Sequence, residues 1–315
     1  MSQFNAESTT EQVIEGISLS GKVAVVTGAS AGLGIETCRA LALAGASVLM
    51  VARDEEKLNT AAQALRASLP GASFDTAIVD LADLDSVRKG AAQILDKCSS
   101  IHLLINNAGV MACPLMRTAQ GHEMQFGTNH LGHFLLTGLL IPALLNGAPG
   151  RVVNLSSGGH KFANVNFDDP DYQSRDYDKW QAYGESKTAN ALFSVALDAR
   201  LAPKGVRAYA VHPGVIMTEL SRHMQQEDFE LLSASAPEGQ TLSFKTVEQG
   251  AATSVWAATS PDLADLGGIY LENCQIAAPA VQGADAGVES YAVDEAAAER
   301  LWAISESLVG QSFEV

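Results

Sequence analysis

The sequence has few cysteines and few basic residues. Its four cysteines, Cys38, Cys98, Cys113 and Cys274, lie far apart and form no CxxC pair. This spacing argues against a disulfide framework or a clustered zinc site and indicates reduced thiols. Lys and Arg number 20 against 36 Asp and Glu, which gives a net charge of −16. We therefore expect neither nucleic acid nor an anionic membrane surface as a partner.

Targeting and membrane-spanning segments are also missing. The first residues show no basic segment followed by an apolar core, so we expect no secretory signal. The longest apolar stretch, residues 131–145, contains His133 and Pro142 and is too short to span a bilayer, so it predicts a buried helix. We expect a cytoplasmic protein without a membrane anchor.

No linker, repeat or low-complexity tract divides the chain. We therefore predict a peripheral N-terminal extension at residues 1–20 and a single domain at residues 21–315. Within that domain, short β-rich runs alternate with helical segments of ten or more residues. This alternation predicts an α/β fold with a Rossmann-type doubly wound parallel sheet of about seven strands. Ligands of such sheets bind beyond the carboxyl ends of the strands.

The first predicted strand ends in "TGASAGLG", residues 27–34. Gly28, Gly32 and Gly34 allow a tight turn and a close approach of the backbone to a pyrophosphate, and the following helix begins with free N–H groups. Ser30 and Leu33 lie in the same turn and are expected to contact the cofactor. The stretch predicts a dinucleotide site, and an ordinary turn is the alternative.

Cofactor type is indicated at the end of the second strand. Ala52 and Arg53 stand where an acidic residue would bond the ribose 2′-hydroxyl, and arginine leaves room and charge for a 2′-phosphate. We therefore expect NADP(H) to be preferred over NAD(H); alternatively, Arg53 only begins a surface loop. Further cofactor contacts are expected at the ends of the third and fourth strands, from Asp80, Leu81, Asn106, Ala108 and Gly109.

Tyr183 and Lys187 are four residues apart in a helical stretch, "AYGESKTAN", so both side chains emerge on one face. A lysine ammonium one turn away favours the tyrosinate and brings the phenol pKa closer to neutrality. Such a phenol can act as an acid or base. Glu185, between them, is expected to point away.

Together with "NNAG", Asn129 in "GTNHLGHF", the serines ending "RVVNLSS", and "HPGVIMT", these motifs resemble the short-chain dehydrogenases/reductases. Within this family, the residues of these motifs resemble those of the branch that includes retinol dehydrogenases, WW-domain oxidoreductase-type enzymes and protochlorophyllide reductases. The resemblance implies hydride transfer between a nicotinamide cofactor and an alcohol or ketone. It also suggests a homo-oligomer, a dimer or tetramer. The lack of a membrane-anchoring segment weakens any transfer of retinoid as substrate.

The resemblance also implies roles for single residues. Tyr183 is the acid/base, Lys187 also bonds the nicotinamide ribose, and Asn129 helps to hold a relay water. Ser157 stabilises the substrate oxygen, whereas strand alternation turns Ser156 inward. Contacts near the nicotinamide are expected from the segment after the sixth strand, at Pro213, Gly214, Ile216 and Thr218.

A substrate lid is predicted at about residues 215–246. With residues 110–116 it would form a hydrophobic pocket for a bulky, lipophilic secondary alcohol or ketone. Its apolar members are Met224, Phe229, Leu231, Leu232 and Leu242. Two other functions stay open: reduction of a C=C bond with the same tyrosine, and a non-catalytic NADP(H) sensor or scaffold.

Three further features have structural interpretations. His130 and His133 lack a third ligand at a suitable spacing, so packing is expected and no metal site is predicted. Residues 168–178 lack the pattern of a calcium loop and are interpreted as a solvated loop. Trp256 and Trp302 lie on apolar helical faces and are expected in the core.

Overall fold

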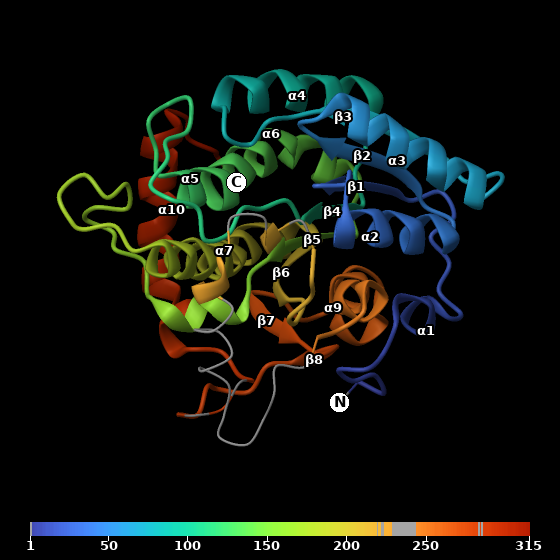
Figure 1. The fold of residues 1–315 in the computed structure, drawn as a ribbon. Helices are drawn as coiled ribbons and strands as arrows, with labels where there is room; N and C mark the ends of the chain where they lie inside the picture. The colour runs from blue at the N-terminus through green and yellow to red at the C-terminus, as the bar shows by residue number, and fades with distance from the viewer. Residues whose placement is uncertain (1, 219, 222–223, 229–243, 283, 285) are drawn as a thin grey trace.

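The computed structural model describes residues 2–218, 220–221, 224–228, 244–282, 284 and 286–315. A single sheet in the order β3-β2-β1-β4-β5-β6-β7-β8 runs through it (Figure 1). The first seven strands are parallel, and β8 pairs antiparallel with β7. The doubly wound α/β prediction is confirmed, with one additional strand that is too short to show a periodicity. The strands are β1 Val23–Thr27, β2 Ser47–Ala52, β3 Phe74–Ile78, β4 Leu103–Asn106, β5 Gly150–Leu155, β6 Val206–His212, β7 Ile269–Glu272 and β8 Gln275–Ile276.

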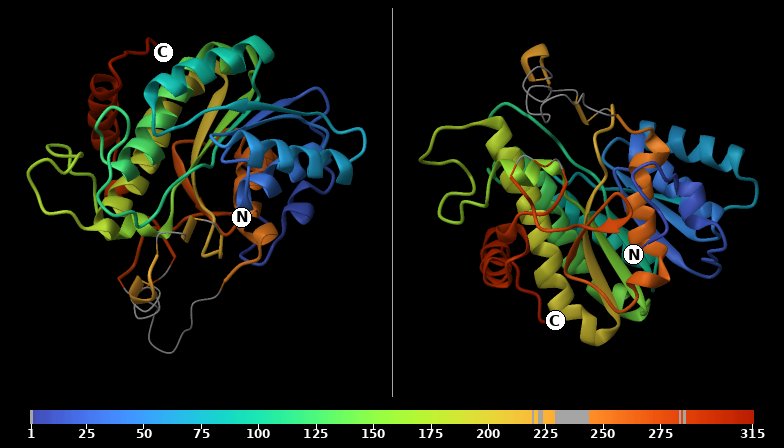
Figure 2. Two further views of the ribbon diagram at one scale, coloured as in Figure 1. Left: turned by 45° about the horizontal axis from the view of Figure 1, so that its top comes forward. Right: turned by 90° about the horizontal axis from the view of Figure 1, so that it is seen from below.

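Helices cover both faces of the sheet (Figures 1 and 2). In β1, Val25 packs on one layer while Ala24 and Val26 pack on the other, so the strand is apolar throughout. One layer contains α1 Thr10–Ile14, α2 Gly32–Leu43, α3 Glu55–Ser68 and α9 Val247–Thr259. The other contains α4 Leu84–Lys97, α6 Gly132–Asn146, α7 Lys179–Leu201 and α10 Glu295–Val309.

The first twenty residues are not peripheral. Val13, Ile14 and Leu19 are buried in the same cluster as residues of α2 and α9. Thr10 donates a hydrogen bond to the buried carboxylate of Glu36. Apolar side chains in one short capped helix therefore make this segment part of the core, and the predicted boundary at residue 20 does not separate two units.

The helix predicted at residues 131–145 is part of a longer helical segment, which begins at α5, Met124–Phe126, and continues through a π-helical turn, Gly127–Leu131, into α6. Residues 117 and 123 form an isolated antiparallel bridge just before this segment. Met124–Asn146 is long and apolar enough to cross a membrane by length and composition, longer than the stretch recognised in the sequence. However, 83% of its most apolar window is buried inside the fold, so it forms a core helix as predicted.

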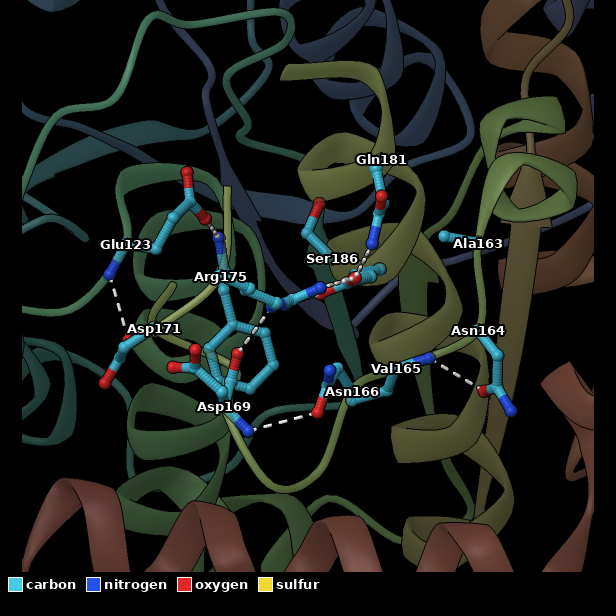
Figure 3. A network of polar contacts seen from close by, with 12 residues as sticks. Glu123, Ala163, Asn164, Val165, Asn166, Asp169, Asp171, Arg175, Gln181 and Ser186 are labelled. Carbon is cyan, nitrogen blue, oxygen red and sulfur yellow. Dashed lines mark hydrogen bonds and ion pairs between the residues drawn. The ribbon is translucent and has the colours of Figure 1, made fainter. Parts of the chain in front are cut away.

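Residues 168–178, interpreted from the sequence as a solvated loop, are exposed in part but are anchored to α7 (Figure 3). Arg175 reaches Glu185 on α7 through two hydrogen bonds of 2.5 Å, and its guanidinium lies 3.5 Å from the ring centroid of Tyr172. Glu185 and Tyr172 are both buried. Glu185 thus takes part in a buried ion pair, which the sequence did not indicate because Arg175 lies in a stretch without periodicity.

Other core predictions are confirmed. Trp256 and Trp302 are 2% and 5% exposed. The four cysteines are thiols, and Cys98 is the least buried of them.

Candidate active site

The glycine-rich turn connects β1 to α2. Gly28 and Gly32 have φ of 67° and 49°, in the left-handed region that favours glycine. A Cβ on Gly34 would lie 2.2 Å from the carbonyl oxygen of Gly28, so only glycine lets helix and strand pack this closely. The N-cap of α2, Ala31, has no side-chain cap, which leaves N–H groups available to an anion. These features fit a pyrophosphate.

Asn107 supports this turn and was missed by the sequence reasoning. Its Nδ2 donates to the carbonyl of Thr27 at 2.8 Å, and its backbone N–H donates to Thr27 Oγ1. Asn106, which was predicted to lie against the cofactor, instead donates to Thr137 and Asn154 inside the sheet. Strand alternation turns the Asn106 side chain into the core, so that side chain does not face the predicted cofactor site.

The two small residues of this loop, Ala108 and Gly109, lie close to the glycine-rich turn and to Asn129 and Lys187. Ala108 Cα would be 2.8 Å from a Cβ on Gly28. A Cβ on Gly109 would lie 3.2 Å from Asn129 Oδ1 and 3.6 Å from Lys187 Nζ. A larger residue at 109 would therefore crowd the site.

Arg53 is exposed and, within the described part of the chain, makes no hydrogen bond or ion pair. With Asp80, Arg117 and Met124 it lines a cavity of about 480 Å³. Leu81, predicted to contact the cofactor, is 6% exposed and packs against Gly132 at the start of α6. Leu81 therefore belongs to the core, and Asp80 alone of that pair lines the cavity.

The segment after β6 folds back onto the glycine-rich turn. Thr218 Cγ2 lies 3.3 Å from the Cβ position of Gly32. Ile216 and Leu33 would both lie within 3 Å of a Cβ on Gly250 in α9. Ser30 is half-buried in the turn itself. The segment predicted to contact the nicotinamide is thus close to the turn predicted to bind the pyrophosphate.

The lid is described only in part. Met217 and Phe244, at its two ends, are 56% and 50% exposed. Met224 is half-buried. Phe229, Leu231, Leu232 and Leu242, on which the predicted pocket depends, lie outside the described residues.

Tyr183 and Lys187 lie together on α7 and are both 3% exposed. Lys187 Nζ is 5.7 Å from the centroid of the Tyr183 ring and donates to the carbonyl of Leu155 at 3.0 Å. The Ser157 side chain, just after β5, lies close enough to the Tyr183 hydroxyl to lower its pKa. Ser156 points inward as predicted and donates to the carbonyl of Lys187. The structure therefore brings the serine, tyrosine and lysine together.

Burial dominates the electrostatics of this group. It raises the pKa of Tyr183 to about 12, and the hydrogen bond with Ser157 acts in the opposite direction. Burial also lowers the pKa of Lys187 to about 8. The expectation that the ammonium would bring the phenol pKa towards neutrality is wrong for the protein alone, because desolvation disfavours both charged forms.

Asn129 lies in the π-helical turn and is fully buried. Its Nδ2 donates to the carbonyl of Val110 and to Ser186 Oγ, and its Oδ1 accepts from the N–H of Val110. The side chain thus ties the loop after β4 to α7. π-helical turns are frequent at functional sites.

His130 and His133 pack inside the fold, as expected. His130 lies against Phe126, Phe134 and Phe193 and is bonded to Ser305. His133 is bonded to Thr27 Oγ1 and to the carbonyl of Asn129.

Similarity to known proteins agrees with this geometry. The family model described as short chain dehydrogenase matches residues 22–228. Retinol dehydrogenase 13 of Homo sapiens is 41% identical over 92% of this chain and 85% of its own. The chloroplastic short-chain dehydrogenase TIC 32 A of Brassica napus is 36% identical over 98% of this chain and 95% of its own.

Solved structures give the same result. A crystal structure of a protein from Mycobacterium paratuberculosis superimposes with a TM-score of 0.75 at 34% identity, covering 100% of both chains. A complex of Pseudomonas aeruginosa RhlG with NADP gives a TM-score of 0.64 at 28% identity, covering 81% of this chain and 95% of RhlG. The chain belongs to the short-chain dehydrogenase family, in its retinol dehydrogenase branch, and is an NAD(P)-dependent oxidoreductase that acts on alcohols.

Proposed function

We propose that this protein interconverts a bulky, lipophilic secondary alcohol and its ketone, or an aldehyde, with NADP(H) and with Tyr183 as acid/base. The observation that carries the proposal is the buried contact of Tyr183 with Ser157, one helical turn from Lys187. The nicotinamide supplies or accepts the hydride when bound. The protein has to orient the substrate oxygen and move one proton.

Each residue has a defined task in this proposal. Ser157 donates a hydrogen bond to the substrate oxygen and stabilises its developing negative charge. Tyr183 Oη gives its proton to that oxygen during reduction and takes it back during oxidation. Because burial keeps the Tyr183 pKa near 12, the phenol is protonated at neutral pH and ready for reduction. Lys187, 5.7 Å from that ring, stabilises the tyrosinate left behind.

Tyr183→Phe tests the acid/base role. We expect a loss of kcat of at least about a hundredfold, with unchanged binding of NADPH and at most a small change in melting temperature, because the substitution removes a single hydroxyl and keeps the buried ring. Tyr209→Phe is a matched control, since Tyr209 is also buried but bonds to the carbonyl of Leu263. Comparable kcat for wild type and Tyr183→Phe would refute the assignment.

The NADP(H) preference rests on Arg53. Its exposed guanidinium borders the 480 Å³ cavity and has no partner in the described part of the chain, so it is available to a 2′-phosphate. RhlG, a structural relative, binds NADP. Arg53→Asp should weaken NADPH binding much more than NADH binding, whereas Arg300→Asp, on the surface of α10, should change neither. Equal loss of both cofactors with Arg53→Asp would contradict this preference.

The lipophilic substrate is supported by the apolar side chains near the site and by the relatives named retinol dehydrogenases. Leu115, Met116 and Met217 are apolar, yet 48%, 42% and 56% of their surfaces are exposed. A spectrophotometric screen with NADPH should find the highest kcat/KM among long-chain or cyclic ketones and aldehydes. Turnover of small hydrophilic polyols alone would overturn the substrate class.

A further inference from the structure

His212, the last residue of β6, connects two loops of the active site through one ring nitrogen. Its Nδ1 accepts a hydrogen bond from the N–H of Gly158 at 3.0 Å and a longer one from the N–H of Gly214 at 3.3 Å. Gly158 directly follows Ser157. Gly214 lies in the turn that is expected to border the nicotinamide. The imidazole therefore couples the position of the substrate-binding serine to that of the cofactor-binding turn.

These two contacts define the state of the ring. An Nδ1 that accepts from N–H groups carries no proton, so the imidazole is neutral with its proton on Nε2. Burial lowers the pKa of His212 to about 3, and the nearby side chains of Lys245, His160 and Lys161 act in the same direction. The acceptor form therefore persists at neutral pH.

Gly158 lies directly against the His212 ring. A Cβ at this position would lie 3.3 Å from His212 Nε2 and 3.5 Å from its Cε1. The absence of a side chain at Gly158 thus permits the close approach of the imidazole, and no left-handed backbone is involved because φ of Gly158 is not positive.

The carbonyl of Ser157 is held separately. It accepts a hydrogen bond from His160 Nδ1 at 2.7 Å and one from the hydroxyl of Tyr270 at 2.9 Å. These donors hold the serine peptide from one side, while His212 holds the next N–H and reaches across to Gly214. Loss of the His212 acceptor would leave the serine loop attached but no longer tied to the cofactor turn.

We propose that His212 is a positioning residue that sets the distance between Ser157 and the Pro213–Gly214 turn. It thereby sets the distance between the substrate oxygen and the nicotinamide. This inference rests on the proposed dehydrogenase function. Small errors in this distance slow hydride transfer strongly, because the reacting atoms must approach to near-contact distance.

A pair of amide substitutions tests the role. In His212→Asn the side-chain oxygen can take the place of Nδ1, whereas in His212→Gln the longer side chain places its amide near the position of Nε2. We expect His212→Asn to keep kcat within about threefold of wild type and His212→Gln to lower it roughly tenfold. Both variants should have similar melting temperatures, so that a difference in kcat reports positioning and not folding.

Cofactor binding gives a second readout that needs no substrate. His212→Gln should weaken NADPH binding roughly fivefold but leave the affinity for adenosine 2′,5′-bisphosphate, which lacks the nicotinamide, unchanged. Gly158→Ala alone should lower kcat less than His212→Gln does. The double variant should have the same kcat as His212→Gln alone, since both substitutions disturb the same contact.

The outcomes separate the two proposals. Equal kcat and equal NADPH affinity for His212→Asn and His212→Gln would overturn the positioning role. A proportional loss of NADPH and adenosine 2′,5′-bisphosphate binding would also overturn it, because it would indicate general damage. If the wild-type protein binds NADPH but reduces no ketone or aldehyde, the proposed function fails, and the ratio of the two affinities still decides the role of His212.

Discussion

Neutralising Glu185 should destabilise the protein much more than neutralising a surface glutamate of similar chemistry. Glu185→Gln keeps the shape of the side chain but removes the charge that pairs with Arg175. The chain offers a matched control in Glu299→Gln, because Glu299 forms the same kind of two-point contact with Arg200, at 2.6 and 2.7 Å.

The two pairs differ in burial, which determines the expected magnitude. The side chains of Glu185 and Arg175 are 3% and 18% exposed, whereas that of Glu299 is 57% exposed. Removing one partner of a buried pair costs about 3–5 kcal/mol, and an exposed pair contributes about 0–1 kcal/mol. Arg175 keeps its contacts with the Tyr172 ring and the carbonyl of Asp169. We therefore expect about 3 kcal/mol for Glu185→Gln.

Urea denaturation followed by circular dichroism measures both values. For a chain of this length 1 kcal/mol corresponds to about 1.5 °C in melting temperature, so Glu185→Gln should also melt about 4–5 °C lower and Glu299→Gln within about 1.5 °C of wild type. Equal destabilisation by the two substitutions would refute the reasoning that burial makes the Arg175 contact important.

Two further predictions concern the active site. Burial lowers the pKa of Lys187 from 10.5 to about 8, so the folded chain binds this proton more weakly than the unfolded chain; the resulting penalty is complete below pH 8 and disappears as pH rises to 10.5. Lys187→Met should abolish turnover yet raise the free energy of unfolding by roughly 2 kcal/mol at pH 7. If this gain in the free energy of unfolding over wild type were equally large at pH 10, the linkage would be contradicted. Gly34→Ala places a Cβ 2.2 Å from a backbone oxygen and should abolish NADPH binding or folding, whereas Gly71→Ala, in open space with a φ of 92°, should cost only about 1–2 kcal/mol. Thermal melts with and without NADPH measure the stability and the cofactor binding of both glycine variants. Equal losses for Gly34→Ala and Gly71→Ala would count against the close-packing argument.

Features encoded in short stretches could be predicted from the sequence. The alternation of strands and helices, the glycine-rich turn at Gly28–Gly34 and the pairing of Tyr183 with Lys187 all depend on residues close together in the chain. Their positions at the carboxyl edge of the sheet follow from the parallel topology. Ser157 also lies near Tyr183 in the structure, although the two residues come from separate elements.

Side-chain direction at strand ends was less predictable. Asn106 and Leu81 are adjacent to residues that do face the site, Asn107 and Asp80, and a shift of one residue at a strand end reverses the side on which a side chain lies. Sequence alternation does not reveal where regular pairing stops. Both residues were therefore assigned to the cofactor although they pack in the core.

Long-range partners could not be predicted for a different reason. Arg175 finds Glu185 because an irregular segment folds back onto α7, and His212 bonds Gly158 because two loops from different strands converge. The histidines were visible in "SSGGH" and "HPG", but those motifs alone do not say which N–H groups they meet. The pKa of Tyr183 was misjudged likewise, because its degree of burial depends on the whole fold.

Transfer of an isotope from labelled NADPH tests the central claim most directly. The protein would be incubated with NADPH carrying deuterium at C4 of the nicotinamide, on either face, and with a lipophilic ketone or enone. The proposed function predicts one deuterium on the carbinol carbon of the product alcohol, from one face only, and none with Tyr183→Phe. Deuterium on the β-carbon of the enone would indicate C=C reduction instead, and no transfer to any carbonyl compound by a protein that binds NADPH would support a sensor or scaffold.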